Sequence, residues 1–106
     1  MKSLVKSARD ALSSKEFTYA LQLCNDGLEL EPNNYHLLVF KASALEKLNQ
    51  FDKAIETYQK AYHSEPKETL ALIGLASLYE KQAKWKDYEQ CLEQVATTYL
   101  SEYFFD

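Results

Sequence analysis

The 106-residue sequence contains only two glycines and two prolines. Because tight turns and flexible linkers depend on these residue types, the chain has little material for β-hairpins or for a linker between domains. No apolar run approaches the roughly 18 residues of a membrane-spanning helix, and residues 1–14 are too charged for a secretory signal. We expect one compact helical domain, located in the cytoplasm or the nucleus and not in a membrane.

Cysteine and histidine are also scarce, with two of each. Cys24 and Cys91 have no CxxC spacing, which argues against a zinc site or a disulfide framework, and we interpret both as small buried hydrophobic residues. No serine, cysteine or aspartate shares a helical face with both His36 and His63, and there is no glycine-rich phosphate loop. We therefore predict a non-catalytic protein with no cofactor and no metal.

Positive charge is in short supply, because 12 lysines and arginines stand against 16 aspartates and glutamates and the net charge is −4. Nucleic-acid-binding proteins normally carry a basic surplus or stripe. Lys2, Lys6 and Arg9 make the N-terminal segment locally basic, but no aromatic residues interleave with them as a stacking platform. We interpret these cations as a solvated face and expect no direct binding of nucleic acid.

The sequence does contain one pattern that returns after 34 residues. The string EPNNYHLLVFKASALEKL at 31–48 returns as EPKETLALIGLASLYEKQ at 65–82, with Glu-Pro, Leu, Ala-Ser and Glu-Lys in the same columns. Apolar residues at helical spacing form one face in each copy: Leu4, Ala8 and Ala11; Leu38, Ala42 and Leu45; Leu72, Ala76 and Tyr79. A second face follows in each copy: Phe17, Ala20 and Cys24; Phe51, Ala54 and Tyr58; Trp85, Tyr88 and Leu92. Each copy therefore predicts two helices.

These columns resemble the tetratricopeptide repeat (TPR) family, whose 34-residue unit follows the pattern W-x2-L-G-x2-Y, A-x3-F and P. The first half of the pattern is matched best in the third copy, by Leu72, Leu75, Ala76 and Tyr79. The second half is matched best in the second copy, by Ala54, Tyr58, Ala61 and Pro66. The resemblance implies an all-α fold, a right-handed α-α superhelix or solenoid of three TPR helix hairpins.

We predict six helices, over residues 2–14, 17–31, 35–48, 51–64, 69–82 and 85 to about 99. They give TPR repeats at 1–34, 35–68 and 69–102. The third repeat is degenerate, because Tyr88 replaces a small residue and Leu100 replaces the proline of the other two. Without that proline, we expect that the last helix can run on through TTYLSEYFF.

Residues 103–106 either end the last helix or begin a missing repeat. The apolar run at this end consists of Tyr99, Leu100, Tyr103, Phe104 and Phe105. It is expected either to fold back on the last hairpin or to pack against a following repeat, since a terminal repeat normally has a polar outer face.

In TPR arrays the first helix of each hairpin lines a concave groove, and the resemblance implies a protein-binding groove here. The predicted partner-binding residues are Val5, Lys6, Arg9, Val39, Phe40, Ser43, Ile73 and Ser77. Val5, Val39 and Ile73 share one column as an aliphatic ladder, and Lys6 and Arg9 make one end basic. Such a groove suits an extended or helical segment of a partner. The alternative is that neighbouring helices partly cover these residues and that they bind nothing.

Chaperone-adaptor members of the family hold a terminal carboxylate with a clamp of Lys, Asn and Arg side chains. The corresponding positions in this sequence are Val5, Arg9, Phe40, Leu70 and Gly74. Only Arg9 could serve, so a two-point grip on a carboxylate is missing. We do not expect a carboxylate-clamp chaperone cofactor.

Several strings outside the general repeat pattern give a closer resemblance. KSARDAL, KEFTYALQLC, NNY with VF, and GLASLYEK are similar to the N-terminal arm of TPR scaffold subunits of the superkiller complex, a cytoplasmic cofactor of the RNA exosome. The match covers residues 5–81. It implies a scaffold that supports 3′–5′ mRNA decay, with helicase, WD-repeat and exosome-associated subunits as protein partners. A free-standing adaptor that binds a partner peptide in its groove is the alternative.

Overall fold

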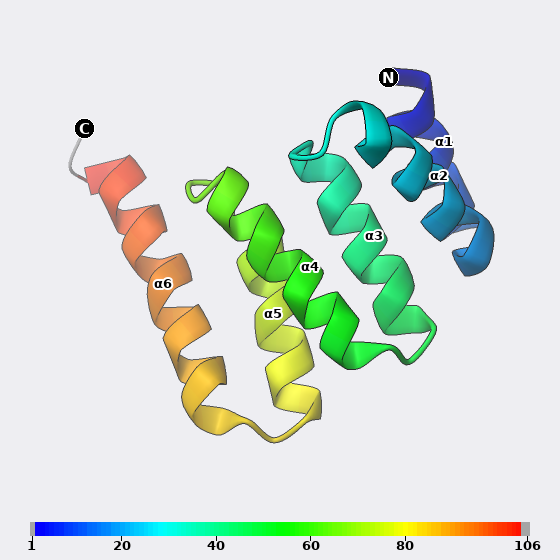
Figure 1. The fold of residues 1–106 in the computed structure, drawn as a ribbon. Helices are drawn as coiled ribbons and strands as arrows, with labels where there is room; N and C mark the ends of the chain where they lie inside the picture. Colours follow the sequence, from blue (N-terminus) through cyan, green and yellow to red (C-terminus); the bar gives the residue numbers. More distant parts are fainter. Residues whose placement is uncertain (1, 105–106) are drawn as a thin grey trace.

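In a computed structural model of the chain, the backbone is described for residues 2–104 and the side chains for residues 3–100. Over this part of the chain the backbone forms six α-helices and no β-strand (Figure 1). The helices are α1 (Lys2–Ser13), α2 (Phe17–Leu30), α3 (Tyr35–Lys47), α4 (Phe51–Ser64), α5 (Leu70–Lys81) and α6 (Trp85–Phe104). The predicted all-α class is confirmed.

The predicted ranges of α1 to α5 agree with the observed bounds to within about one residue. Helix α6 continues past residue 99 to Phe104, in agreement with the expectation that the helix runs on where no proline stops it. Pro32 and Pro66 follow α2 and α4, where proline cannot continue a helix, whereas Leu100 occupies the corresponding position in α6. The side chains of Tyr103 and Phe104 and the whole of Phe105 lie outside the described residues.

The two helices of each hairpin are joined by the same backbone turn. Lys15, Asn49 and Ala83 all have left-handed backbone angles, with φ of 63°, 64° and 56°. In each turn this residue donates its N–H to the carbonyl three residues back, and the next N–H reaches the carbonyl five residues back. This Schellman arrangement satisfies the last carbonyls of the first helix. Its recurrence gives the three hairpins the same internal geometry.

The hairpins stack so that each first helix covers the second helix of the hairpin before it. Helix α3 packs against α2, and α5 packs against α4. The first helices also touch one another, α1 with α3 and α3 with α5, whereas over residues 2–104 the second helices do not approach one another. The array is therefore a curved helical-repeat solenoid with its first helices on the inner side.

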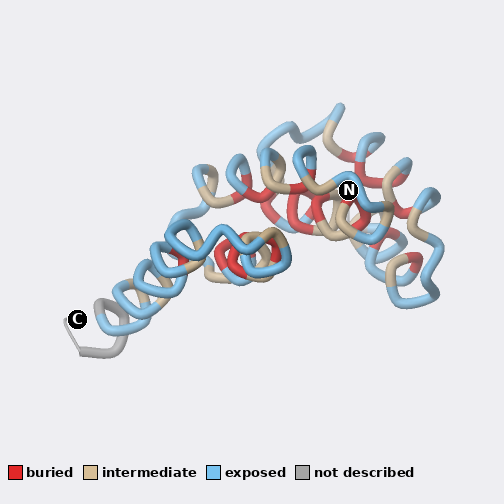
Figure 2. The backbone as a smooth tube through the Cα atoms, turned by 90° about the horizontal axis from the view of Figure 1, so that it is seen from below, coloured by how far each residue is buried: buried red, intermediate tan, exposed pale blue. Residues whose placement is uncertain are grey.

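Burial follows this stacking order. Helix α3 lies between two hairpins and is the most deeply buried element, and α5 is also largely enclosed, whereas α6 is mostly exposed (Figure 2). Cys91 is the one buried residue among the described side chains of α6. Tyr99 and Leu100, the described part of the apolar C-terminal run, are about half exposed.

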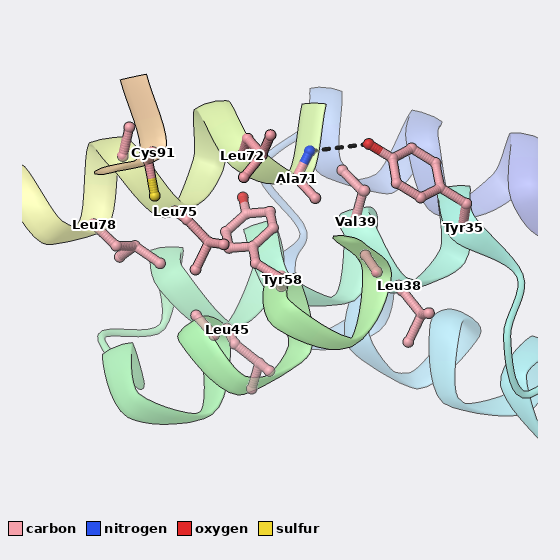
Figure 3. Packing of buried hydrophobic residues seen from close by; sticks show 14 residues of the cluster. Tyr35, Leu38, Val39, Leu45, Tyr58, Ala71, Leu72, Leu75, Leu78 and Cys91 are labelled. Carbon is pink, nitrogen blue, oxygen red and sulfur yellow. Dashed lines mark hydrogen bonds between the residues drawn. The ribbon is translucent and has the colours of Figure 1, made fainter. Parts of the chain in front are cut away.

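A glycine lets α4 and α5 approach closely. The ring of Tyr58 points from α4 towards Leu72 and Leu75 of α5 (Figure 3). It lies against the backbone of Gly74, where an added Cβ would collide with the ring. Gly27 has a milder restriction, since a Cβ there would meet the tip of the Leu37 side chain.

We predict that Gly74→Ala destabilises the fold, although alanine favours a helix by about 1 kcal/mol over glycine. Overpacking against the enclosed ring costs about 1–3 kcal/mol, so the free energy of unfolding in urea should fall. Gly27→Ala is the matched control and should lose less, because an added Cβ there meets one leucine methyl closely, whereas at Gly74 it meets three atoms of a ring. A Gly74→Ala variant at least as stable as the parent would contradict the close approach of the two helices.

The turn at Ala83 gives a second prediction. Ala83→Gly should raise the free energy of unfolding by about 0.5–1 kcal/mol, because glycine adopts a positive φ without the steric cost that alanine has there. Ala96→Gly, on the exposed surface of α6, should instead lower it by about 1 kcal/mol through lost helix propensity. The melting temperature and the urea midpoint should therefore rise for Ala83→Gly and fall for Ala96→Gly. A shift of both variants in the same direction would contradict the left-handed turn at Ala83.

Candidate protein-binding face

The surface formed by α1, α3 and α5 on the inner side of the array, called the inner face below, carries the residues predicted to bind a partner. The structure leaves these residues exposed to different degrees. Lys6, Arg9 and Ile73 are exposed; Val5, Phe40, Ser43 and Ser77 are half-buried; and Val39 is buried. The side chains available to a partner therefore lie mainly on α1 and α5, the helices at the two ends of the inner face.

The side chain of Val39 is not open to a partner on the inner face. Only 9% of it is exposed, and it belongs to the larger core cluster, where it lies near Tyr35 and Ala71 (Figure 3). Helix α3 has a first helix on each side, α1 and α5, so its inward-facing residue Val39 is covered. Helix α5 has a first helix on one side among the described residues, and its Ile73 remains 53% exposed. The ladder of Val5, Val39 and Ile73 is therefore interrupted at its centre, and Val39 supports the face from within the core.

The basic end of the inner face contains an arginine positioned over a phenylalanine ring. The guanidinium carbon of Arg9 lies 5.7 Å from the centre of the Phe40 ring, a cation–π contact that links α1 to α3. Among the described side chains, neither Arg9 nor Lys6 forms an ion pair. The contact favours this position of the guanidinium while its N–H donors remain available to a carboxylate.

The other end of the face is apolar. Leu70, which occupies a missing clamp position and, like Ile73, an inward-facing column of the repeat, is 51% exposed one turn before Ile73 on α5. The two side chains are three residues apart and share one face of the helix.

The start of α5 is fixed by a hydrogen bond from outside its own hairpin. The N-cap residue Thr69 makes no side-chain hydrogen bond. Instead the buried hydroxyl of Tyr35, at the start of α3, accepts the N–H of Ala71 at 2.9 Å (Figure 3). This bond satisfies one of the unpaired donors at a helix start and sets the position of the adjoining Leu70.

At the far end of α5 a salt bridge crosses the inner face. Lys81 Nζ lies 2.6 Å from Glu46 Oε2, which joins α5 to α3. Beneath it, burial and the Glu46 charge raise the pKa of Tyr58 far above its usual range, so the phenol stays protonated. Lys81, Glu46 and Tyr58 are thus engaged in structural contacts, and Leu70 and Ile73 are the exposed apolar residues of α5.

The chemistry of the described residues does not resemble that of a thiol enzyme. Burial raises the pKa of Cys24 to about 11 and also raises the pKa of Cys91, so both thiols are protonated near neutral pH. The described residues hold no group of three or more His, Cys, Asp or Glu side chains that could bind a metal ion. None of the helices described is long and apolar enough to cross a membrane.

Comparison with known proteins gives close sequence relatives. A family model described as tetratricopeptide repeat matches residues 5–69 and 41–90. The chain is 40% identical to tetratricopeptide repeat protein 37 of Xenopus laevis over 103 residues, which are 97% of this chain and 6% of that protein. It is 48% identical to superkiller complex protein 3 of Mus musculus over 81 residues, which are 76% of this chain and 5% of that protein.

The chain spans only about 5–6% of the length of these relatives. The predicted similarity to a superkiller scaffold subunit is confirmed over that span. Among solved structures, the TPR domain of Sgt2 from Aspergillus fumigatus matches with a TM-score of 0.85 and 25% identity, covering 92% of this chain and 64% of that one. Repeat columns, hairpin turns, stacking order and family model all agree, and the chain belongs to the tetratricopeptide repeat family.

Proposed function

We propose that the chain is a non-catalytic protein-interaction arm of a superkiller complex scaffold subunit, which supports 3′–5′ mRNA decay by the cytoplasmic RNA exosome. The identity of 48% to superkiller complex protein 3 across 76% of the chain favours this scaffold over an unrelated TPR adaptor. Helicase, WD-repeat and exosome-associated subunits are the proposed partners. Binding to them needs no catalytic group and no cofactor.

The observation that carries a binding role is the open apolar pair on the inner face. Leu70 and Ile73 are each about half exposed although they belong to a helix that is otherwise largely enclosed. Fully burying one aliphatic side chain of this size contributes about 1.5–3 kcal/mol. A partner that covers both residues thus gains more than a typical rim contact provides.

The two ends of the inner face also specify a direction for the partner segment. Apolar side chains of the segment would lie over Leu70 and Ile73, and an Asp or Glu side chain would reach the Arg9 guanidinium. Arg9 lies over the Phe40 ring, and its guanidinium can receive a carboxylate through two parallel N–H bonds. One polar and one apolar anchor fix the orientation of the segment, because reversing it would place a carboxylate on the aliphatic pair.

The double variant Leu70→Ser with Ile73→Ser tests the apolar anchor. Both side chains are exposed, so the variant should remain folded, and it should recover at least about tenfold less helicase and WD-repeat subunit from cell extract. The control is Tyr19→Ser with Leu30→Ser, which removes two exposed apolar residues from α2. Quantitative mass spectrometry of the co-purified proteins gives the measurement. Undiminished recovery with the first variant would exclude the inner face as the binding surface.

Arg9→Glu tests the basic anchor and should behave differently. It should weaken partner recovery strongly near ~0.01 M salt and much less near ~0.15 M, because a rim charge acts through a field that salt screens. Lys86→Glu, an exposed site on α6, makes the same change in net charge and should have little effect. An equal loss with the two variants would assign the effect to overall charge and not to the site.

A further inference from the structure

On the outer side of the array a basic cleft opens between α2 and α4, with α3 as its floor. Its volume is about 360 Å³, and its lining includes the lysines Lys41, Lys53 and Lys60. Leu21 and Leu45 provide apolar lining, and Glu56 is the one acidic residue of the lining. The cleft exists because the second helices of successive hairpins do not approach each other over residues 2–104.

The next hairpin provides an internal comparison. A cleft of about 340 Å³ lies between α4 and α6 over α5, and its lining includes most of the residues found 34 positions after those of the basic cleft. A shift by one repeat of 34 residues relates Lys41 to Leu75, Lys53 to Asp87, and Lys60 to Gln94. All three lysines are replaced by uncharged or acidic residues although the helices are arranged in the same way. The fold therefore does not require the positive charge of the basic cleft.

Lys41 is the most informative of the three lysines. At the equivalent position Leu75 is only 4% exposed and belongs to the core. Lys41 is half-buried there, and no described acidic side chain forms an ion pair with it. Leucine would bury more apolar area at this site than the lysine does. Lys41 therefore adds less to the core than Leu75 does, and its unpaired positive charge is available to an anionic group that approaches from outside.

The geometry points to a second binding site: we propose that the basic cleft binds an acidic segment of a protein partner. One aliphatic side chain of the segment would enter the cleft against Leu21 and Leu45, and flanking carboxylates would pair with Lys41, Lys53 and Lys60. The volume is suited to one or two side chains, and three cations against one anion provide the charge complementarity. This site lies opposite the inner face and does not depend on the function proposed for that face.

A protein segment fits the cleft better than a nucleic acid. Single-stranded nucleic acids are bound by a basic groove combined with aromatic side chains on which the bases stack. The lining of the basic cleft contains no aromatic residue. An apolar floor under a basic rim matches instead an aliphatic side chain flanked by aspartates or glutamates.

The probe for this site is a synthetic peptide with one leucine between two aspartate pairs, titrated into ¹⁵N-labelled protein by NMR. A peptide with asparagine in place of each aspartate controls for charge, and a single-stranded oligouridylate tests the nucleic-acid alternative. We expect shifts at the amides of Lys41, Lys53 and Lys60 with the acidic peptide and at least about tenfold weaker binding of the asparagine peptide. Tighter binding of the oligouridylate through the same lysines would overturn the proposal.

The variant Lys53→Asp with Lys60→Gln installs the residues of the second cleft, which the same fold already accommodates. It should bind the acidic peptide at least about tenfold more weakly. Lys86→Asp with Lys84→Gln, at two exposed sites outside the lining, makes the same change in net charge and should bind like the parent. If both variants bound the peptide equally weakly, the loss would reflect net charge alone, and the proposed site would be refuted.

Lys41→Leu separates binding from folding. Because leucine occupies the equivalent core position at Leu75, the variant should unfold at the same or a higher temperature than the parent while its affinity for the acidic peptide falls. A variant that loses stability and keeps its affinity would show that Lys41 serves the fold, and this would contradict the assignment.

Discussion

The contact between the second helix of one hairpin and the first helix of the next holds this molecule together. Cys24 and Tyr58 occupy equivalent positions in α2 and α4, and both are almost fully buried by the helix that follows. Leu92, at the same position in α6, is 46% exposed, because no further helix follows among the described residues. A hairpin of two helices has an apolar face that it cannot cover alone, so every surface property of the array depends on which helix comes next.

The two junctions fill their space in opposite ways. At the first, the small Cys24 shares a cluster with the large Phe40 of α3. At the second, the large Tyr58 lies against Gly74 of α5, the residue equivalent to Phe40. The combined volume is thus divided differently between the same two positions. This exchange has a consequence for the inner face, because Phe40 is large enough to reach that surface and to support Arg9, whereas Gly74 leaves it open.

The helices and their pairing could be predicted from the sequence, because apolar spacing and the 34-residue interval are local properties of the chain. The exposure of side chains on the inner face could not be predicted in this way. Val39 and Ile73 share a column of the repeat, but two first helices flank Val39 and one flanks Ile73 among the described helices. The basic cleft could not be predicted from the sequence for a related reason. Its lysines come from two helices, and each one by itself has the appearance of a solvated surface charge. The comparison of equivalent positions, Lys41 with Leu75, is what distinguishes this lysine from its neighbours on the surface.

The separation of the second helices gives the array a mechanical property. The inner side is held by direct contacts of α1 with α3 and of α3 with α5, whereas the outer side has clefts between α2, α4 and α6. The contacts of α2 with α3 and of α4 with α5 also join the hairpins, and none of these contacts closes the outer clefts, so a change in the angle between successive hairpins would widen or narrow those clefts. A bound segment in the basic cleft would act as a wedge between α2 and α4. Occupation of one small site would then set the curvature of the solenoid, and with it the spacing of the side chains on the opposite face.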